Sequence, residues 1–109
     1  MKRTVPIVAG VCLYLAAIGT ALAAGDAKLG EKQASSCNGC HGADGRGEGP
    51  NPPLAGMKEA YFIQQMNDYK SGARSHLFMQ RLAQGLSDPH IANMAAYYAS
   101  LPLPSGKDK

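Results

Sequence analysis

The sequence lacks tryptophan and has only two phenylalanines, so the large side chains that build a core are scarce. It also lacks a strong surplus of charge, because eleven Lys and Arg residues stand against eight Asp and Glu residues. Without a basic stripe, binding to nucleic acid is not expected. The cysteine count is three, and an odd number argues against a framework built only of disulfides. At 109 residues the chain is long enough for one domain, which excludes a multidomain enzyme.

The N-terminal segment has the pattern of an export signal. Lys2 and Arg3 give it a positive start, and an apolar run follows over residues 5–22. Residues 21–23 (Ala-Leu-Ala) have the small-x-small pattern that signal peptidase recognises. The alternative is an uncleaved membrane anchor, because the apolar run is near the roughly 20 residues that a membrane span needs. The pattern at 21–23 favours a signal peptide over residues 1–23.

Cleavage after Ala23 would place the mature chain in the periplasm, with no membrane span. It would also discard Cys12 and leave a domain over residues 24–104 with a flexible tail over 105–109. Nine basic and eight acidic residues would remain, a net charge of +1. A domain this small buries little surface, so we expect a bound group to serve as part of its core.

The hydrophobic pattern of this domain predicts an all-α fold of about four helices. The expected helices cover residues 26–35, 57–70 and 75–84, and a last segment from a cap at Ser87 or Asp88 to Pro102. Residues 42–56 contain five glycines and three prolines, so we expect a loop without regular structure there. A loop of this length in a small domain is usually functional.

Cys37, Cys40 and His41 form the pattern Cys-x-x-Cys-His, which is typical of c-type haem attachment. The two thiols add to the two vinyl groups on one edge of the porphyrin, and the two intervening residues let one turn of chain span them. The next residue, His41, then lies under the ring, where an imidazole nitrogen can bind the iron. Export fits this chemistry, because c-type haem is attached outside the cytoplasm. The pattern predicts one haem c, bound covalently through Cys37 and Cys40.

Three other uses of the two cysteines have less support. A thioredoxin-like redox pair needs a βαβ context, which the sequence does not offer. A zinc site could combine Cys37 and Cys40 with His76 and His90, but these spacings match no common zinc module. A structural disulfide would leave His41 and the glycine-rich loop without a role. Haem attachment is therefore the preferred interpretation.

The second axial ligand of the iron must come from a residue downstream of His41. The candidates are Met57, Met66, Met79, Met94, His76 and His90. Met66 and Met94 lie on apolar helix faces, which is typical of core residues. Met79 lies in a short segment that can wrap to the opposite face of the ring, so it is preferred, with His76 second. His/Met ligation fills both axial positions and leaves no open site for a substrate, which indicates electron transfer.

Several stretches of the sequence match a known family. They are residues 24–27 (AGDA), 37–45 (CNGCHGADG), 52–56 (PPLAG), 61–74 with its exit KSGAR, 79–88 (MQRLAQGLSD) and 97–100 (YYAS). With these stretches, residues 26–101 resemble a class I cytochrome c. The chain is most similar to the proteobacterial cytochrome c4 and c-553 domains and to the cytochrome subunit of flavocytochrome c sulfide dehydrogenase.

The resemblance implies a class I cytochrome c fold wrapped around a single haem. It implies that Met79 is the axial methionine and that the carbonyl of Pro52 accepts a hydrogen bond from the imidazole of His41. It also implies that Gly30 is the small residue at which the first and last helices cross, against Tyr97. Cytochrome c4 proteins carry two such domains, whereas these 109 residues hold one Cys-x-x-Cys-His, so a two-haem relay within them is not expected.

The sequence therefore predicts a periplasmic monohaem electron carrier, and not an enzyme. Leu54 is a candidate to exclude water from the haem. Further candidates for this role are Phe62, Met66, Leu82, Ile91 and Met94. The expected partners are redox proteins, such as a flavoprotein dehydrogenase or a terminal oxidase. Two rival functions are the electron-accepting subunit of a flavoprotein sulfide dehydrogenase, which residues 79–88 favour, and a gas sensor or enzyme with a labile sixth ligand.

Overall fold

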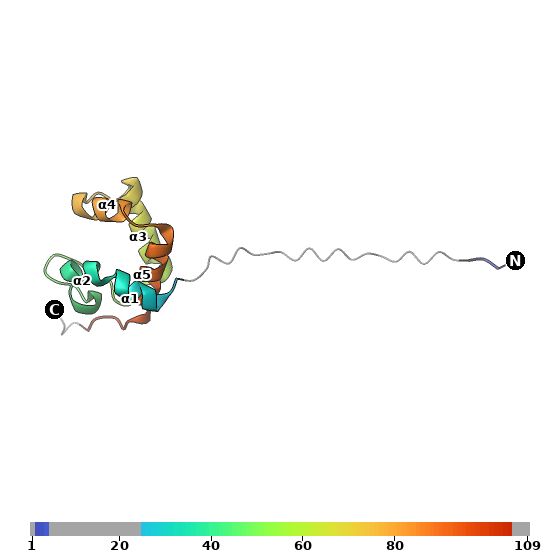
Figure 1. Ribbon diagram of the computed structural model, residues 1–109, viewed down its shortest axis with the longest axis horizontal. Coiled ribbons are helices and arrows are strands. Elements are labelled where there is room, and N and C mark those ends of the chain that lie inside the picture. Colours follow the sequence, from blue (N-terminus) through green and yellow to red (C-terminus); the bar gives the residue numbers. More distant parts are fainter. Residues whose placement is uncertain (1, 5–24, 106–109) are drawn as a thin grey trace.

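The computed structural model describes residues 2–4 and 25–105, and the described part of the domain is helical (Figure 1). Its elements are α1 (Ala27–Gln33), α2 (Ser35–His41), the 3-10 turn η1 (Ala43–Gly45), α3 (Glu59–Ser71), α4 (Leu77–Gln84) and α5 (Asp88–Ser100). The only strand-like feature among these residues is an isolated bridge between Glu48 and Asn51. The expected all-α fold is confirmed.

The predicted signal peptide lies almost wholly outside the described residues, as does most of the predicted tail. Both therefore stay predictions. Within residues 2–4 and 25–105, the structure contains no helix with the length and apolar character needed to cross a membrane.

Local sequence signals explain where several helices begin and end. The Asp26 carboxylate accepts hydrogen bonds from the backbone N–H groups of Lys28 and Leu29 and so caps α1. The Ser87 hydroxyl caps α5 in the same way, and Pro89 lies in the first turn of that helix. Helix α3 ends at Gly72, whose φ of 83° is the left-handed conformation that glycine adopts without strain. These ends agree with the sequence pattern.

Several helix boundaries differ from those expected; the helix predicted over 75–84, for example, begins at Leu77. The first predicted helix ends near residue 35, whereas the structure bends at Ala34 and continues as α2 through His41. Helix α3 begins at Glu59 rather than at Met57, because the N–H of Met57 donates to the Leu54 carbonyl in a turn and Lys58 is extended (ψ 138°). The predicted loop over 42–56 also contains the short turn η1.

The core forms where the first and last helices cross. Helix α1 packs against α5, α3 packs against both α5 and α4, and α2 packs against α1 and η1. A Cβ added at Gly30 would overlap the backbone carbonyl of Asn93, so only glycine lets the two helices approach this closely. The resemblance implies that Gly30 crosses α5 at Tyr97. In the structure, the nearest α5 atoms to Gly30 belong to the backbone of Asn93 and Met94, about one turn earlier in the helix. The largest fully buried side chains are Ile91, Met94 and Tyr98, all on α5.

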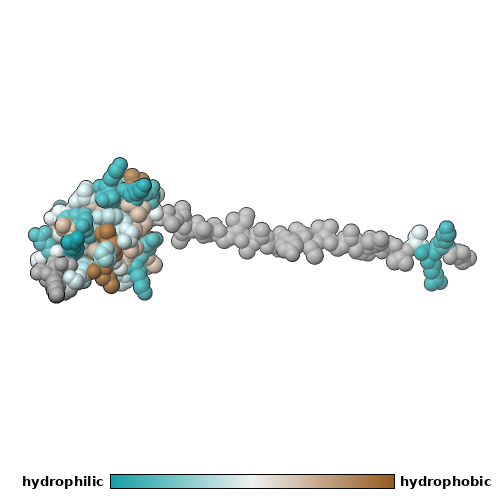
Figure 2. Space-filling view, turned by 90° about the horizontal axis from the view of Figure 1, so that it is seen from below, coloured by the Kyte–Doolittle hydropathy of each residue, from teal (hydrophilic) through white to brown (hydrophobic). Residues whose placement is uncertain are grey.

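In the view of Figure 1, α2 and α4 lie on the left side of the domain, with α4 above α2. Helix α4 also carries exposed apolar side chains, with Leu77 72% and Phe78 60% exposed. Elsewhere hydrophilic groups cover most of the face seen in Figure 2, and the apolar groups there form small separate patches.

Candidate functional site

Helix α2 carries the two cysteines one turn apart. Cys37 is partly buried and Cys40 is exposed, and both are free thiols. The Cys37 sulfur lies 4.0 Å from the sulfur of Met94 in α5. Burial raises the pKa of the Cys37 thiol. Cys40 therefore faces solvent, while Cys37 packs against the core cluster.

His41 closes the same helix and is buried. Its Nδ1 lies 2.7 Å from the backbone carbonyl oxygen of Pro52. Because a carbonyl only accepts hydrogen bonds, Nδ1 carries the proton and Nε2 keeps the lone pair that can bind a metal. The pair of atoms is the one that the resemblance implies, and the geometry fixes both the tautomer and the orientation of the ring.

The loop after His41 folds back onto the end of α2. The N–H of Gly47 donates to the carbonyl of His41 at 2.6 Å, and the side-chain amide of Asn51 donates to the carbonyl of Cys40 at 2.8 Å. The N–H groups of Leu54 and Ala55 both donate to the carbonyl of Gly45. The segment that sequence alone predicts as an irregular loop is therefore held by its own backbone.

A buried tyrosine ties α2 to the core. The Tyr98 hydroxyl donates to the side-chain oxygen of Asn38 at 2.6 Å, and Asn38 lies between the two cysteines. Burial raises the pKa of Tyr98 well above its ordinary value. A Cβ at Gly45 would touch the same tyrosine ring, so the start of the loop also packs here.

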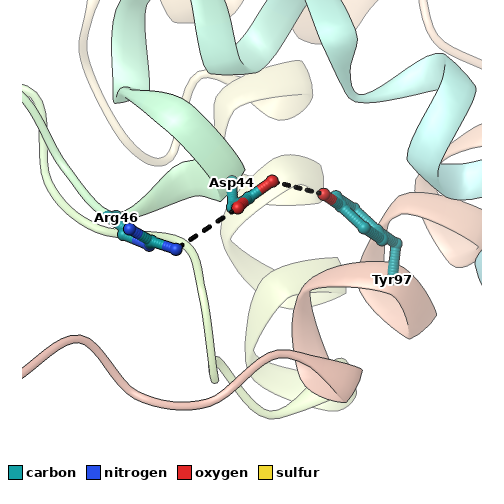
Figure 3. A network of polar contacts seen from close by, with 3 residues as sticks. All are labelled: Asp44, Arg46 and Tyr97. Atoms are coloured by element: carbon teal, nitrogen blue, oxygen red, sulfur yellow. Dashed lines mark hydrogen bonds and ion pairs between the residues drawn. The ribbon is translucent and has the colours of Figure 1, made fainter.

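A second polar network holds the loop against α5 (Figure 3). Asp44, whose φ of 53° is unusual for a residue other than glycine, lies 3.4 Å from the guanidinium of Arg46. The Tyr97 hydroxyl donates to the other carboxylate oxygen of Asp44 at 3.5 Å. Burial and the nearby Asp44 charge raise the pKa of Tyr97. Sequence reasoning did not find this network, because no spacing rule connects residues so far apart in the chain.

Met79 lies in the first turn of α4 and is partly buried against the core cluster. Its backbone N–H donates to Nδ1 of His76 at 3.2 Å, so His76 caps the helix. The side chains of Met66 and Met94 are buried within the core, as their helix faces predict. Leu54 is partly buried at the edge of the same cluster.

The alternative zinc site is not assembled. Across residues 2–4 and 25–105, no three His, Cys, Asp or Glu side chains lie close enough to hold a metal ion. His76 caps α4 instead, and the Nδ1 of His90 lies 2.8 Å from the Ser87 hydroxyl at the start of α5. Without those histidines, Cys37 and Cys40 cannot complete a four-ligand zinc site.

The donor set fits a c-type haem. It offers two free thiols one helical turn apart, an oriented imidazole with a free Nε2, and a thioether in Met79. Imidazole and thioether are the ligands of the His/Met class of haem sites. The exposed Leu77 and Phe78 of α4 add an apolar surface beside Met79 of the kind that a porphyrin can cover.

Comparison with known proteins identifies the family. Residues 27–102 match the family model of cytochrome c. The chain belongs to the cytochrome c family. Membership of this family implies a covalently bound haem c and agrees with the resemblance seen in the sequence.

The cytochrome c relatives include proteins of about twice this length. Cytochrome c4 of Pseudomonas aeruginosa is 45% identical over 101 residues, which are 92% of this chain and 50% of that protein. The crystal structure of cytochrome c4 from Pseudomonas stutzeri has 35% identity and a TM-score of 0.70, over 76% of this chain and 49% of that one. The chain thus spans about half the length of these cytochrome c4 relatives.

Two further cytochrome c relatives are informative. Cytochrome c-554(548) of Halomonas halodenitrificans is 43% identical over 81 residues, which are 71% of this chain and 98% of that protein. A thiosulfate dehydrogenase electron acceptor of Thiomonas intermedia is 40% identical over 77 residues, which are 69% of this chain and 35% of that protein. The first matches as a single unit, and the second matches over part of its length.

Proposed function

We propose that this chain is a periplasmic electron-transfer cytochrome that binds one haem c and uses His41 and Met79 as its axial ligands. The observation that carries the proposal is the orientation of His41, whose Nδ1 is hydrogen-bonded to Pro52 and whose Nε2 is left to bind iron. The similarity to cytochrome c4 supports electron transfer, and the pattern of residues 1–23 supports the periplasm.

Each residue of the site has a distinct task in this function. The thiols of Cys37 and Cys40 hold the group covalently, so that a small domain retains it. The Pro52 carbonyl orients His41 and raises the donor strength of its free nitrogen. Leu54 and the apolar side chains of α4 exclude water. When bound, the haem supplies one-electron exchange between Fe(III) and Fe(II), which requires no open coordination position.

The placement of the methionines supports Met79 as the second ligand. Met66 is 6% exposed and Met94 is 1% exposed, so both thioethers are committed to the core. Met79 is only partly buried, and it lies on the helix that carries unpartnered apolar side chains. Met57 is also partly buried, which makes it the matched control.

Visible absorption spectroscopy tests the ligand assignment. The wild-type ferric protein is expected to show the weak long-wavelength band of a methionine–iron bond, and a pyridine haemochrome assay should give one haem per chain. Met79→Ala should lose the band and bind carbon monoxide in the ferrous state, whereas Met57→Ala should keep the band. A band that survives in Met79→Ala and is lost in Met57→Ala would reject the assignment. Recovery of the haem-containing protein by osmotic shock tests the periplasmic location.

Two kinds of enzyme are candidates for the electron donor of this cytochrome, and one of them is a thiosulfate-oxidising enzyme. The relative from Thiomonas intermedia, named as a thiosulfate dehydrogenase electron acceptor, favours this partner, whereas the pattern of residues 79–88 favours a flavoprotein sulfide dehydrogenase. Stopped-flow measurement of haem reduction by each enzyme with its own substrate separates the two. Fast reduction by the thiosulfate-oxidising enzyme alone would support that enzyme as the donor. Fast reduction by the flavoprotein sulfide dehydrogenase alone would support the flavoprotein.

A further inference from the structure

Besides the bond from Gly47 to the His41 carbonyl, the loop that follows α2 returns to this helix at two adjacent points. The side-chain amide of Asn51 donates to the Cys40 carbonyl at 2.8 Å. The carbonyl of the next residue, Pro52, accepts from Nδ1 of His41 at 2.7 Å. Two neighbouring residues of the loop are therefore bonded to two neighbouring residues of the helix, and the second bond includes the proposed iron ligand.

The backbone of Asn51 is itself fixed. Its N–H donates to the carbonyl of Glu48 at 3.0 Å, and its carbonyl accepts from the N–H of Glu48 at 3.1 Å. These bonds close a tight turn through Gly49, whose φ of 55° suits glycine. Because both backbone groups are occupied within the turn, the side chain of Asn51 is the group by which this residue reaches α2, while the N–H of Gly47 holds the other side of the turn to the carbonyl of His41 at 2.6 Å.

A bond at Asn51 restrains the Pro52 carbonyl. The peptide unit between the two residues is planar, and the proline ring fixes the φ of Pro52. With Asn51 held against Cys40, the Pro52 carbonyl has little freedom to move away from His41. If the amide of Asn51 were absent, the Asn51 side of the turn could move away from α2 while the Gly47 side stayed bonded to His41, and the hydrogen bond to Nδ1 would lengthen.

We propose that Asn51 is a positioning residue for the axial imidazole and sets the strength of the bond between His41 and Pro52. A stronger bond at Nδ1 increases the electron donation from Nε2, which favours Fe(III) over Fe(II) and lowers the reduction potential. Asn51 would thus tune the potential through Pro52 and His41. This inference rests on the proposed function, with His41 as ligand.

The test is Asn51→Ala in the haem-containing protein. The reduction potential is expected to rise relative to wild type. The Nδ1 proton of His41, followed by NMR in the reduced protein, is expected to exchange faster with solvent. Asn51→Ser keeps a donor on a shorter side chain, so both quantities should fall between those of wild type and Asn51→Ala. If Asn51→Ala cannot be produced, Asn51→Ser alone tests the proposal, because its potential and proton exchange should still differ from those of wild type.

Asn93→Ala is the matched control. The side-chain oxygen of Asn93 accepts a hydrogen bond from the N–H of Asp26, also at 2.8 Å and also between two separate segments. Its loss should lower stability and leave the potential and the exchange of the His41 proton unchanged.

Two results separate failure of this inference from failure of the proposed function. An Asn51→Ala protein that is less stable, but has the wild-type potential and proton exchange, would show that Asn51 only caps α2 and would overturn the inference. A wild-type protein without an iron-bound imidazole would overturn the proposed function itself, and that result is seen before any variant is compared.

Discussion

Tyr98 is the side chain through which the core reaches the helix of the attachment motif. It is 0% exposed, and its ring lies 5.5 Å from that of Phe62 and 5.1 Å from that of Tyr97. Its hydroxyl donates to Asn38, between the two cysteines. Loss of this hydroxyl leaves the Asn38 oxygen without its donor and removes one of the links between α2 and α5, the contact of Cys37 with Met94 being another.

Tyr98→Phe should lower the free energy of unfolding by about 1–2 kcal/mol, because it leaves a partly buried acceptor without its donor. Tyr97→Phe is the control, since its hydroxyl bond to Asp44 is 3.5 Å long, and its loss should have an effect below about 0.5 kcal/mol. Denaturant unfolding of the two variants measures the difference. Equal effects would contradict a special role for the bond to Asn38.

The same tyrosines predict loss of stability at alkaline pH. Burial raises the pKa of both, so the folded protein keeps protons that the unfolded chain releases above about pH 10. Their contribution is complete below that pH and falls as the pH rises, and for Tyr98 it falls by at most about 1.4 kcal/mol per pH unit. In denaturant titrations from about pH 8 to 11, Tyr98→Phe should show a shallower decline than wild type. An unchanged decline would contradict this assignment.

Some residues of the site can be predicted from the sequence, and others cannot. Cys37, Cys40 and His41 are visible because their chemistry depends on local spacing. Asn38 and Asn51 are not visible in this way, because asparagine is common in turns and their roles come from partners supplied by folding. The ligand roles of His41 and Met79 stay predictions until a spectrum is measured.

At the scale of elements, the crossing of α1 and α5 depends on Gly30. A Cβ there would overlap the backbone of Asn93, which cannot move aside like a flexible side chain. Gly30→Ala should therefore separate the helices and lower the free energy of unfolding by about 1–3 kcal/mol. Gly39→Ala is the matched control, because a Cβ at Gly39 has no neighbour within 4 Å. It should raise stability by about 0.5–1 kcal/mol, since alanine favours a helix.

Thermal or denaturant unfolding of these two alanine variants gives the comparison directly. A Gly30→Ala protein as stable as Gly39→Ala would show that the crossing can widen without loss.

The success of prediction also varies between elements. Helix α5 follows its sequence closely, because Ser87, Pro89 and an apolar face all indicate the same segment. Helix α2 is less visible, since Ser35, Ser36 and Gly39 are weak helix formers. Its helical form rests on tertiary bonds from Tyr98 and the loop, which no local pattern shows.

At the scale of the whole molecule, the polypeptide forms a small core and leaves apolar side chains of α4 exposed to solvent. Leu77 and Phe78 remain mostly exposed, so the polypeptide alone does not bury all its large apolar side chains. A group that binds only the folded state stabilises that state by mass action. We expect the attached haem to supply much of the stability of this domain.

Replacing both attachment residues, in Cys37→Ser/Cys40→Ser, tests this expectation. The variant should lose about 5 kcal/mol or more, which is comparable to the whole stability of a small domain, and should be largely unfolded at room temperature. Circular dichroism during heating measures it against the wild-type protein with haem. A cooperative transition near the wild-type temperature, without haem, would contradict the expectation.

The pairing of α1 with α5 also has a consequence for the order of folding. The first helix of the domain finds its main partner only in the last, more than 50 residues later, so the contacts that close the domain are long-range in sequence. An N-terminal fragment that stops before Asp88 leaves α1 with only its small contact with α2 and without its main partner. For a chain that emerges from its N-terminus, we therefore expect the cysteine-bearing segment to stay open until α5 is available to close the domain.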